Sequence, residues 1–178
     1  MLSCTRITEA EELAANGLWA EYEAAFPRSE RRSAAQHARA MALEADFHCM
    51  QCCVGGKIVG LLFYWQMPHC VYVEHFAICA ACRGRGYGRL VLQWLQQQGL
   101  PIILEIEPPE CPATRRRQRF YESAGFVPQP YPHIQPAYHA DTEPLPMLLM
   151  GWPGVIAADA VAAFERNLHE RVMSYTDR

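Results

Sequence analysis

The feature that most constrains this sequence is a glycine-rich segment, residues 83–88 (RGRGYG), which connects a strand-like segment to a helix-like one. Residues 71–78 (VYVEHFAI) are rich in aromatic and β-branched side chains, which predicts a strand buried on at least one face. Residues 90–98 carry apolar side chains at helical spacing. A strand, a glycine turn and a helix start direct several free N–H groups to one point, where the helix dipole favours negative charge. The segment therefore predicts a pyrophosphate site.

Two familiar phosphate-binding loops do not fit this segment. The Walker motif G-x-x-x-x-G-K-[ST] does not occur in the sequence, and the dinucleotide motif G-x-G-x-x-G fails because the residue three after Gly86 is Arg89. The alternative is a tight turn without a ligand, since glycine reaches positive φ at little steric cost. The flanking strand and helix favour the binding site.

The segment instead fits the pattern R-x-x-G-x-G, with Arg83, Gly86 and Gly88 at the defining positions. A second pattern, F/Y-Y-E-x-x-G-F, fits within residues 119–126 (RFYESAGF). With these motifs in this order and a predicted strand between them, the chain resembles the GNAT superfamily, the acyl-coenzyme A dependent N-acyltransferases. The resemblance covers roughly residues 1–152. It implies an α/β fold with a mixed, mostly antiparallel central sheet flanked by helices, and a splay between the two central strands, residues 71–78 and 102–107.

The resemblance also implies acetyl-CoA as the cosubstrate, without a metal. The residues expected to bind the coenzyme are Ala77, Ile78, Arg83, Gly84, Arg85, Gly86, Tyr87, Gly88 and Phe120. One position departs from the family pattern. Thr114 stands where many members carry an asparagine that contacts the coenzyme, so we expect the contacts to the pantetheine or phosphates to differ. The basic run at residues 115–117 is either a solvated helix face or a neighbour of the phosphates.

N-acyl transfer places three chemical demands on a site. The acceptor amine has a pKa of about 10.4 when it is lysine-like, so a base must remove its proton. The thioester carbonyl needs a donor such as a backbone N–H to stabilise the oxyanion. The departing thiolate, with a pKa of roughly 8.5 for a simple thiol, benefits from an acid.

Tyr121 suits the role of the acid. It lies four residues before Gly125, where many GNAT enzymes carry a tyrosine close to the coenzyme sulfur. The alternative is a buried tyrosine whose hydroxyl only finds a hydrogen-bond partner.

Glu74 suits the role of the base, because it is a carboxylate within an otherwise apolar strand. Strand alternation predicts that it shares a face with Tyr72, Phe76 and Ile78, and we expect apolar surroundings to raise its pKa. A salt-bridged carboxylate is the alternative.

Three other residues could act as the base instead of Glu74. Glu105 and Glu107 share one face of the next predicted strand, and His75 is expected on the face opposite Glu74.

Composition sets the remaining limits. The 178 residues, 51% hydrophobic and 20% charged, suit one globular domain over residues 1–152, with residues 153–178 as a C-terminal helix packed on it. Sixteen basic and nineteen acidic residues give a net charge of −3, which argues against a nucleic-acid partner.

The N-terminus has no signal-like apolar segment, and no apolar run could span a bilayer, so a cytoplasmic protein without a membrane partner is expected. The sequence does not determine whether the protein forms a homodimer.

Eight cysteines invite a zinc or disulfide interpretation, since Cys49/Cys52 and Cys79/Cys82 have the spacing of zinc knuckles. Residues 47–54 are predicted as a strand, however, in which positions i and i+3 point to opposite faces. Free buried thiols are therefore expected.

The rest of the chain alternates helices and strands. Helices are expected at residues 9–25, 33–43 and 157–175, strands at 47–54, 58–65 and 147–152, and a proline-rich loop at 128–146.

Together these features predict an N-acetyltransferase that moves the acetyl group of acetyl-CoA to a primary amine of a small molecule or peptide by direct attack. The alternative is a catalytically silent module that only binds acyl-CoA, and a third possibility is a cysteine-based zinc protein. The sequence does not specify the acceptor.

Overall fold

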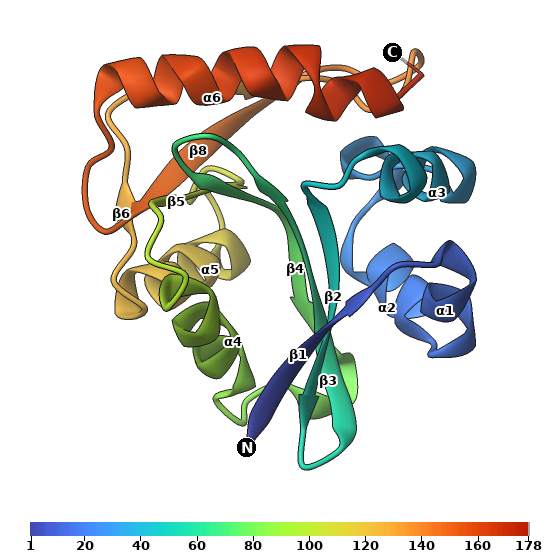
Figure 1. The fold of residues 1–178 in the computed structure, drawn as a ribbon. Helices are drawn as coiled ribbons and strands as arrows, with labels where there is room; N and C mark the ends of the chain where they lie inside the picture. The colour runs from blue at the N-terminus through green and yellow to red at the C-terminus, as the bar shows by residue number, and fades with distance from the viewer. Residues whose placement is uncertain (178) are drawn as a thin grey trace.

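The computed structural model describes residues 1–177, which form one mixed sheet flanked by helices (Figure 1). The strand order is β1-β2-β3-β4-β5-β8-β6, with β7 paired to β8. The strands are β1 (Leu2–Ile7), β2 (Phe47–Val54), β3 (Lys57–Gln66), β4 (Val71–Ile78), β5 (Ile102–Ile106), β6 (Val127–Pro128), β7 (His133–Gln135) and β8 (Leu145–Trp152). Among the strands within residues 1–177, only β4 and β5 pair in parallel. The predicted mostly antiparallel α/β fold is therefore confirmed.

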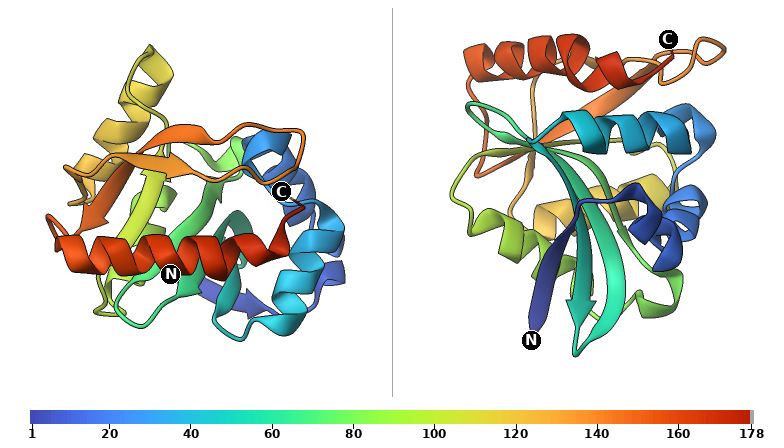
Figure 2. Two further views of the ribbon diagram at one scale, coloured as in Figure 1. Left: turned by 90° about the horizontal axis from the view of Figure 1, so that it is seen from above. Right: turned by 45° about the vertical axis from the view of Figure 1, so that its right-hand side comes forward.

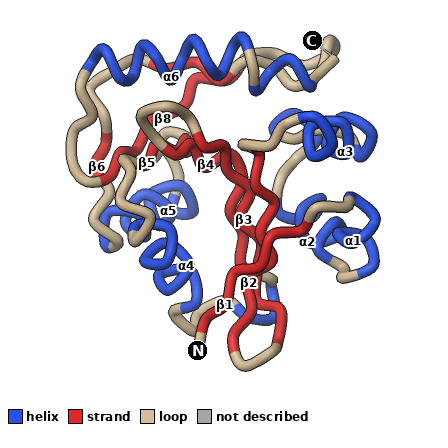
Figure 3. The backbone as a smooth tube through the Cα atoms, in the orientation of Figure 1, coloured by secondary structure: helices blue, strands red, loops and turns tan. Residues whose placement is uncertain are grey.

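Helices cover both faces of this sheet. They are α1 (Ala10–Ala15), α2 (Leu18–Ala25), α3 (Ala34–Leu43), α4 (Tyr87–Gln96), α5 (Pro112–Ser123) and α6 (Ala158–Glu170), with short 3₁₀ helices η1 (Arg28–Glu30), η2 (Ala80–Cys82) and η3 (Val172–Tyr175). Figure 3 shows α1, α2 and α3 on one side of the strands and α4 and α5 on the other. In Figure 2, α6 lies across one end of the sheet. None of the described helices is both long and apolar enough to cross a membrane.

The two faces bury separate apolar clusters, because strand residues alternate between them. Tyr22, Phe63 and Phe164 belong to the cluster beneath α1, α2, α3 and α6. Val91 and Leu104 belong to the cluster beneath α4 and α5. Cys49 and Cys52 fall in different clusters, so the two thiols face opposite sides of β2 as expected.

The splay between the central strands is confirmed by the register. β4 pairs with β5 only from Val71 to Val73, opposite Ile102 to Leu104, whereas β4 itself continues to Ile78. The second half of β4 therefore has a free edge on the side of β5. A bulge in the β3–β4 ladder lies at the same place: His75 opposes Phe63 and Val73 opposes Tyr64, so Glu74 is the extra residue.

Several expected element boundaries were wrong. The helix expected at residues 9–25 is two helices, because Gly17 between them takes a left-handed conformation with φ of 74°. The helix expected from residue 90 begins at Tyr87, since Gly86 (φ 76°) is its N-cap. The last helix ends at Glu170 and continues as a short 3₁₀ turn. Strand β1 was not anticipated, and β7 lies within the expected proline-rich loop.

Candidate active site

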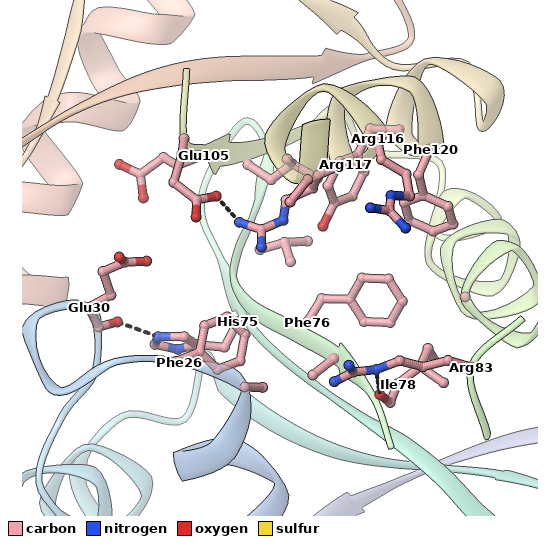
Figure 4. Close-up of a pocket in the computed structure, with 18 of the residues that line it drawn as sticks. Phe26, Glu30, His75, Phe76, Ile78, Arg83, Glu105, Arg116, Arg117 and Phe120 are labelled. Atoms are coloured by element: carbon pink, nitrogen blue, oxygen red, sulfur yellow. Dashed lines mark hydrogen bonds and ion pairs between the residues drawn. The ribbon is translucent and has the colours of Figure 1, made fainter. Parts of the chain in front are cut away.

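A cavity of about 780 Å³ opens where β4 and β5 diverge (Figure 4). Its walls come from the end of α2, the second half of β4, the glycine loop, β5 and one face of α5. The two sequence motifs, far apart along the chain, therefore meet at one cavity.

The glycine loop has the geometry of an anion site at one end of this cavity. Gly84 and Gly86 take φ values of 75° and 76°, which only glycine reaches without strain. No side chain of the described residues caps the start of α4. The first amides of α4 are therefore available to an anion, and the helix dipole favours its charge.

Gly88 has a second role, which is close packing. A Cβ atom at this position would lie 2.9 Å from Cζ of Phe120, so only glycine lets α4 approach the ring from α5 this closely. Phe120 thereby joins the two motifs in space.

The structure brings eight of the nine expected coenzyme residues to the cavity wall. These are Ala77, Ile78, Arg83, Gly84, Gly86, Tyr87, Gly88 and Phe120. Arg85 is exposed and does not line the cavity. The Arg83 side chain folds back, and its Nε donates to the carbonyl oxygen of Ile78 at 3.1 Å.

The basic run on α5 divides between the two roles considered for it. Arg116 and Arg117 line the cavity, whereas Arg115 donates to the carbonyl oxygens of Pro109 and Glu110. Thr114 caps the N-terminus of α5 and does not line the cavity. Its hydroxyl accepts a hydrogen bond from the Cys111 N–H at 3.1 Å in a capping box.

The free edge of β4 presents main-chain groups to the cavity. In an antiparallel pair, every second residue directs its main-chain N–H and C=O groups to the partner strand. Cys79, just after β4, is one of these residues, because its N–H donates to the Val59 carbonyl oxygen of β3 at 2.9 Å. The main-chain groups of Ala77 and His75 therefore point to β3, and those of Phe76 and Ile78 point toward the gap. This edge offers donors and acceptors to an extended ligand.

Tyr121 lines the same cavity, and its hydroxyl is free of hydrogen bonds within the described residues. The residue is 8% exposed and lines the cavity, and within residues 1–177 its hydroxyl makes no hydrogen bond. Burial raises the pKa of Tyr121 to about 12, and the charge of Arg117 opposes this only in part. The phenol therefore keeps its proton at neutral pH, as an acid must.

The expectations for the surroundings of Glu74 were correct for Tyr72 and wrong for Phe76, Ile78 and His75. Because of the bulge, Phe76 and Ile78 belong to the opposite face from Tyr72, and the Glu74 carboxylate points to the Tyr72 side, as His75 does. Its side chain is 0% exposed although the residue as a whole is not buried, so the main chain of Glu74 faces the cavity.

The Glu74 carboxylate is held by three donors. Arg32 Nη1 donates at 2.5 Å, and Trp65 Nε1 and the Tyr138 hydroxyl each donate at 2.8 Å. Burial alone would raise the pKa of Glu74, but the charge of Arg32, helped by His75 and the hydrogen bonds, outweighs burial and lowers it. The expected raised pKa is thus corrected, because a fully buried arginine, Arg32, was not anticipated. No local pattern distinguishes Arg32 from Arg28 and Arg31, which are not buried.

Glu105 forms a second buried network at the other end of the cavity. Its oxygens accept from the Tyr72 hydroxyl at 2.6 Å, from Gln135 Nε2 at 3.0 Å and, at very short range, from His133 Nε2. His133 Nδ1 lies 3.3 Å from Glu165, whose side chain is 40% exposed. The network therefore runs from the cavity to the surface. Burial disfavours charge on His133, but both carboxylates outweigh burial and raise its pKa.

His75 and Glu30 complete this end of the cavity. His75 Nε2 donates to the Glu30 carbonyl oxygen at 2.8 Å, and burial lowers the pKa of the ring, so His75 is neutral with its lone pair on Nδ1. Glu107 also lines the cavity and is ion-paired with Arg117.

No group of three His, Cys, Asp or Glu side chains that could hold a metal was found among residues 1–177. All eight cysteines are free thiols.

Comparison with known proteins identifies the class. Residues 12–126, more than half of the chain, match the model of the acetyltransferase (GNAT) family, so the chain belongs to this family. It is similar to a GNAT-family acetyltransferase structure from Bacteroides thetaiotaomicron, with 28% identity, a TM-score of 0.86, and coverage of 96% of this chain and 98% of that one.

A more distant solved structure shares the fold, and one further protein matches part of the sequence. Arabidopsis thaliana Naa50, solved with the bisubstrate analogue CoA-Ac-MVNAL, is 17% identical with a TM-score of 0.60, over 84% of this chain and 97% of that one. The Bacillus subtilis (strain 168) protein YjbC, assigned as an acetyltransferase, is 22% identical over 120 residues, 66% of this chain. That match spans only 62% of the length of YjbC.

Proposed function

We propose that this protein transfers the acetyl group of acetyl-CoA to a primary amine by direct attack. The observation that carries the proposal is one cavity that joins three features: the uncapped start of α4, the free edge of β4 and the uncommitted hydroxyl of Tyr121. GNAT enzymes use acyl-CoA, and the cavity has suitable groups for the pyrophosphate, the pantetheine arm and the thioester of that molecule.

The coenzyme would lie along the cavity from the glycine loop toward β5. The amides at the start of α4 would hold the pyrophosphate, with Arg83 and Arg116 close to its charge. The pantetheine amides would pair with the main-chain groups of Phe76 and Ile78 on the free edge. The exposed main chain of Glu74 at the bulge would supply the N–H that donates to the thioester oxygen.

The reaction moves three protons. The acceptor ammonium first loses one proton to a base, and the neutral nitrogen then forms a bond to the acetyl carbon. As the carbon–sulfur bond breaks, Tyr121 gives its proton to the departing thiolate, and the second proton that the nitrogen loses restores the phenol. The catalytic role expected for Glu74 is untested. The side chains of Glu74 and Glu105 are both buried, but the network of Glu105 reaches the surface, so we propose Glu105 as the base and a positioning role for Glu74. His133 and Glu165 connect Glu105 to the surface.

The test combines coenzyme binding with thiol release. Calorimetry should show that acetyl-CoA binds, and a panel of amines, amino acids and peptide N-termini should give thiol release with at least one acceptor. Glu105→Gln should reduce turnover at neutral pH, with a smaller loss at high pH where the amine deprotonates unaided. Coenzyme binding without thiol release for any acceptor would favour the silent binding module, a possible second function for the same cavity.

A further inference from the structure

The charges along the cavity are unevenly distributed. In Figure 4, Arg83 and Arg116 lie toward one end and Glu30 and Glu105 toward the other. Arg117 and Glu107 also line the cavity, but they form an ion pair with each other, so their charges largely cancel. The cationic end suits the coenzyme phosphates, and the other end presents carboxylates to whatever binds opposite them.

Glu30 is the carboxylate at this end that lacks a partner. Its main chain is fixed by the hydrogen bond from His75, but within residues 1–177 its side chain forms no ion pair and no hydrogen bond. Partial burial raises the pKa of Glu30, although the charge of Arg117 opposes the shift. A cation beside Glu30 would therefore be favourable, since it would replace solvation that the carboxylate has lost.

Gln135 supplies an independent sign of a missing ligand. Its Nε2 must face Glu105, because a carboxylate only accepts hydrogen bonds. Its Oε1 is then left buried without a donor, on a residue that is 6% exposed and lines the cavity. A buried acceptor without a partner is costly, so an N–H group of a ligand is the expected partner.

The surface beside these groups is apolar. Phe26, Pro27 and Met147 line the same cavity. Such a wall suits methylene groups between two polar ends of a ligand.

Building on the proposed function, we propose that the acceptor is an aliphatic diamine or a similar dication. One amine hydrogen-bonds Gln135 Oε1, loses a proton to Glu105 and forms the bond to the acetyl carbon as the carbon–sulfur bond breaks. The second amine keeps its proton and pairs with Glu30. The products are a singly acetylated, singly charged amine, the free coenzyme thiol and one released proton.

The experiment compares molecules that differ only at the end remote from the reacting amine. For chains of two to six carbons, we would measure kcat/KM for each diamine, the monoamine and the amino acid with a terminal carboxylate. The diamine should be the best acceptor at one length. Glu30→Gln should weaken the diamine at least about fivefold and leave the monoamine unchanged, whereas Glu30→Lys should favour the amino acid over the diamine. Glu11→Gln, at an exposed position on α1, is the matched control.

Binding provides a readout that does not depend on turnover. The diamine should bind the coenzyme-loaded protein in calorimetry and lose affinity in Glu30→Gln, with an unchanged melting temperature. Monoamines that react as well as diamines, or a diamine preference unchanged in Glu30→Gln, would overturn the inference and leave the proposed function intact. Equal loss for monoamine and diamine in Glu30→Gln would also overturn it, by making Glu30 the base. Diamine binding without thiol release would contradict the proposed transfer, and with it the role of the diamine as acceptor, and would leave only a diamine-binding site at Glu30.

Discussion

Arg32 and Glu74 form an ion pair of 2.5 Å between two side chains that are both 0% exposed. Arg32 Nη2 also donates to the carbonyl oxygen of Val172 at 2.7 Å. The pair therefore ties the segment between η1 and α3 to the bulge of β4 and to the C-terminal η3. Since the Glu74 main chain faces the cavity, the same pair fixes the conformation of the cavity wall.

We expect Glu74→Gln to act mainly on stability. The substitution leaves Arg32 buried and charged without a counter-ion, which typically costs about 3–5 kcal/mol. Urea unfolding should show this loss in the free energy of unfolding, and Glu11→Gln should show none. The double variant with Arg32→Met should recover much of it. A stable single variant with strongly reduced turnover would instead support Glu74 as the base.

The same pair predicts acid sensitivity. The folded-state pKa of Glu74 is lowered, so its contribution to stability is fully present above the unfolded value of about 4.3 and is lost as the pH falls through the folded-state pKa. The difference in unfolding free energy between the parent protein and Glu74→Gln should therefore shrink below pH of about 4. If the difference in unfolding free energy did not change with pH in this range, the assignment of Glu74 as an ionised carboxylate would be contradicted.

His133 predicts the opposite pH dependence. Its folded-state pKa is raised, so its stabilising effect is fully present below the unfolded value of about 6.5 and is lost as the pH rises through the folded-state pKa. His133→Gln should cost about 2 kcal/mol at pH 6 and less at pH 9, since hydrogen bonds to charged groups contribute about this much. Chemical unfolding at both pH values checks this, with the exposed His69→Gln as control. A cost that grows with pH would be inconsistent with a charged His133.

Gly88 predicts a graded loss of coenzyme affinity. Gly88→Ala forces Phe120 to move, because the new Cβ would lie 2.9 Å from its ring, and we expect a loss of roughly tenfold. Gly88→Asp adds a negative charge at the phosphate site and should abolish binding. Calorimetry with acetyl-CoA measures both. Parental affinity in a folded Gly88→Asp variant would place the pyrophosphate elsewhere.

Tyr121→Phe isolates the phenolic hydroxyl. Because this hydroxyl has no hydrogen-bond partner within residues 1–177, its deletion should leave the melting temperature and coenzyme affinity unchanged. Loss of the acid should lower kcat about 10²–10⁴-fold. A variant that turns over at the parental rate would show that Tyr121 has no role in proton transfer.

The fold and the cavity end formed by the glycine loop and α5 were predictable from the sequence, because both depend on local patterns. The glycine run after an apolar strand and the FYESAGF segment each specify a short structure with fixed geometry, and the structure places both on one cavity. Strand periodicity likewise placed Cys49 and Cys52 on opposite faces.

The acceptor end was not predictable in this way. A single extra residue at the β4 bulge put Phe76 and Ile78 on the face opposite Glu74, and no local pattern marks such a bulge. The partners of Glu74 and Glu105 come from distant segments, Arg32, Tyr138 and His133 among them, and only tertiary packing brings them together.

The most direct test of the proposed acetyl transfer is mass spectrometry of the acceptor after incubation with acetyl-CoA and the protein. We expect one acetyl group to appear on an amine of the acceptor, in step with release of one coenzyme thiol, and both signals to disappear with Gly88→Asp. Acetyl-CoA that binds but leaves every amine unmodified would contradict the proposed transferase activity.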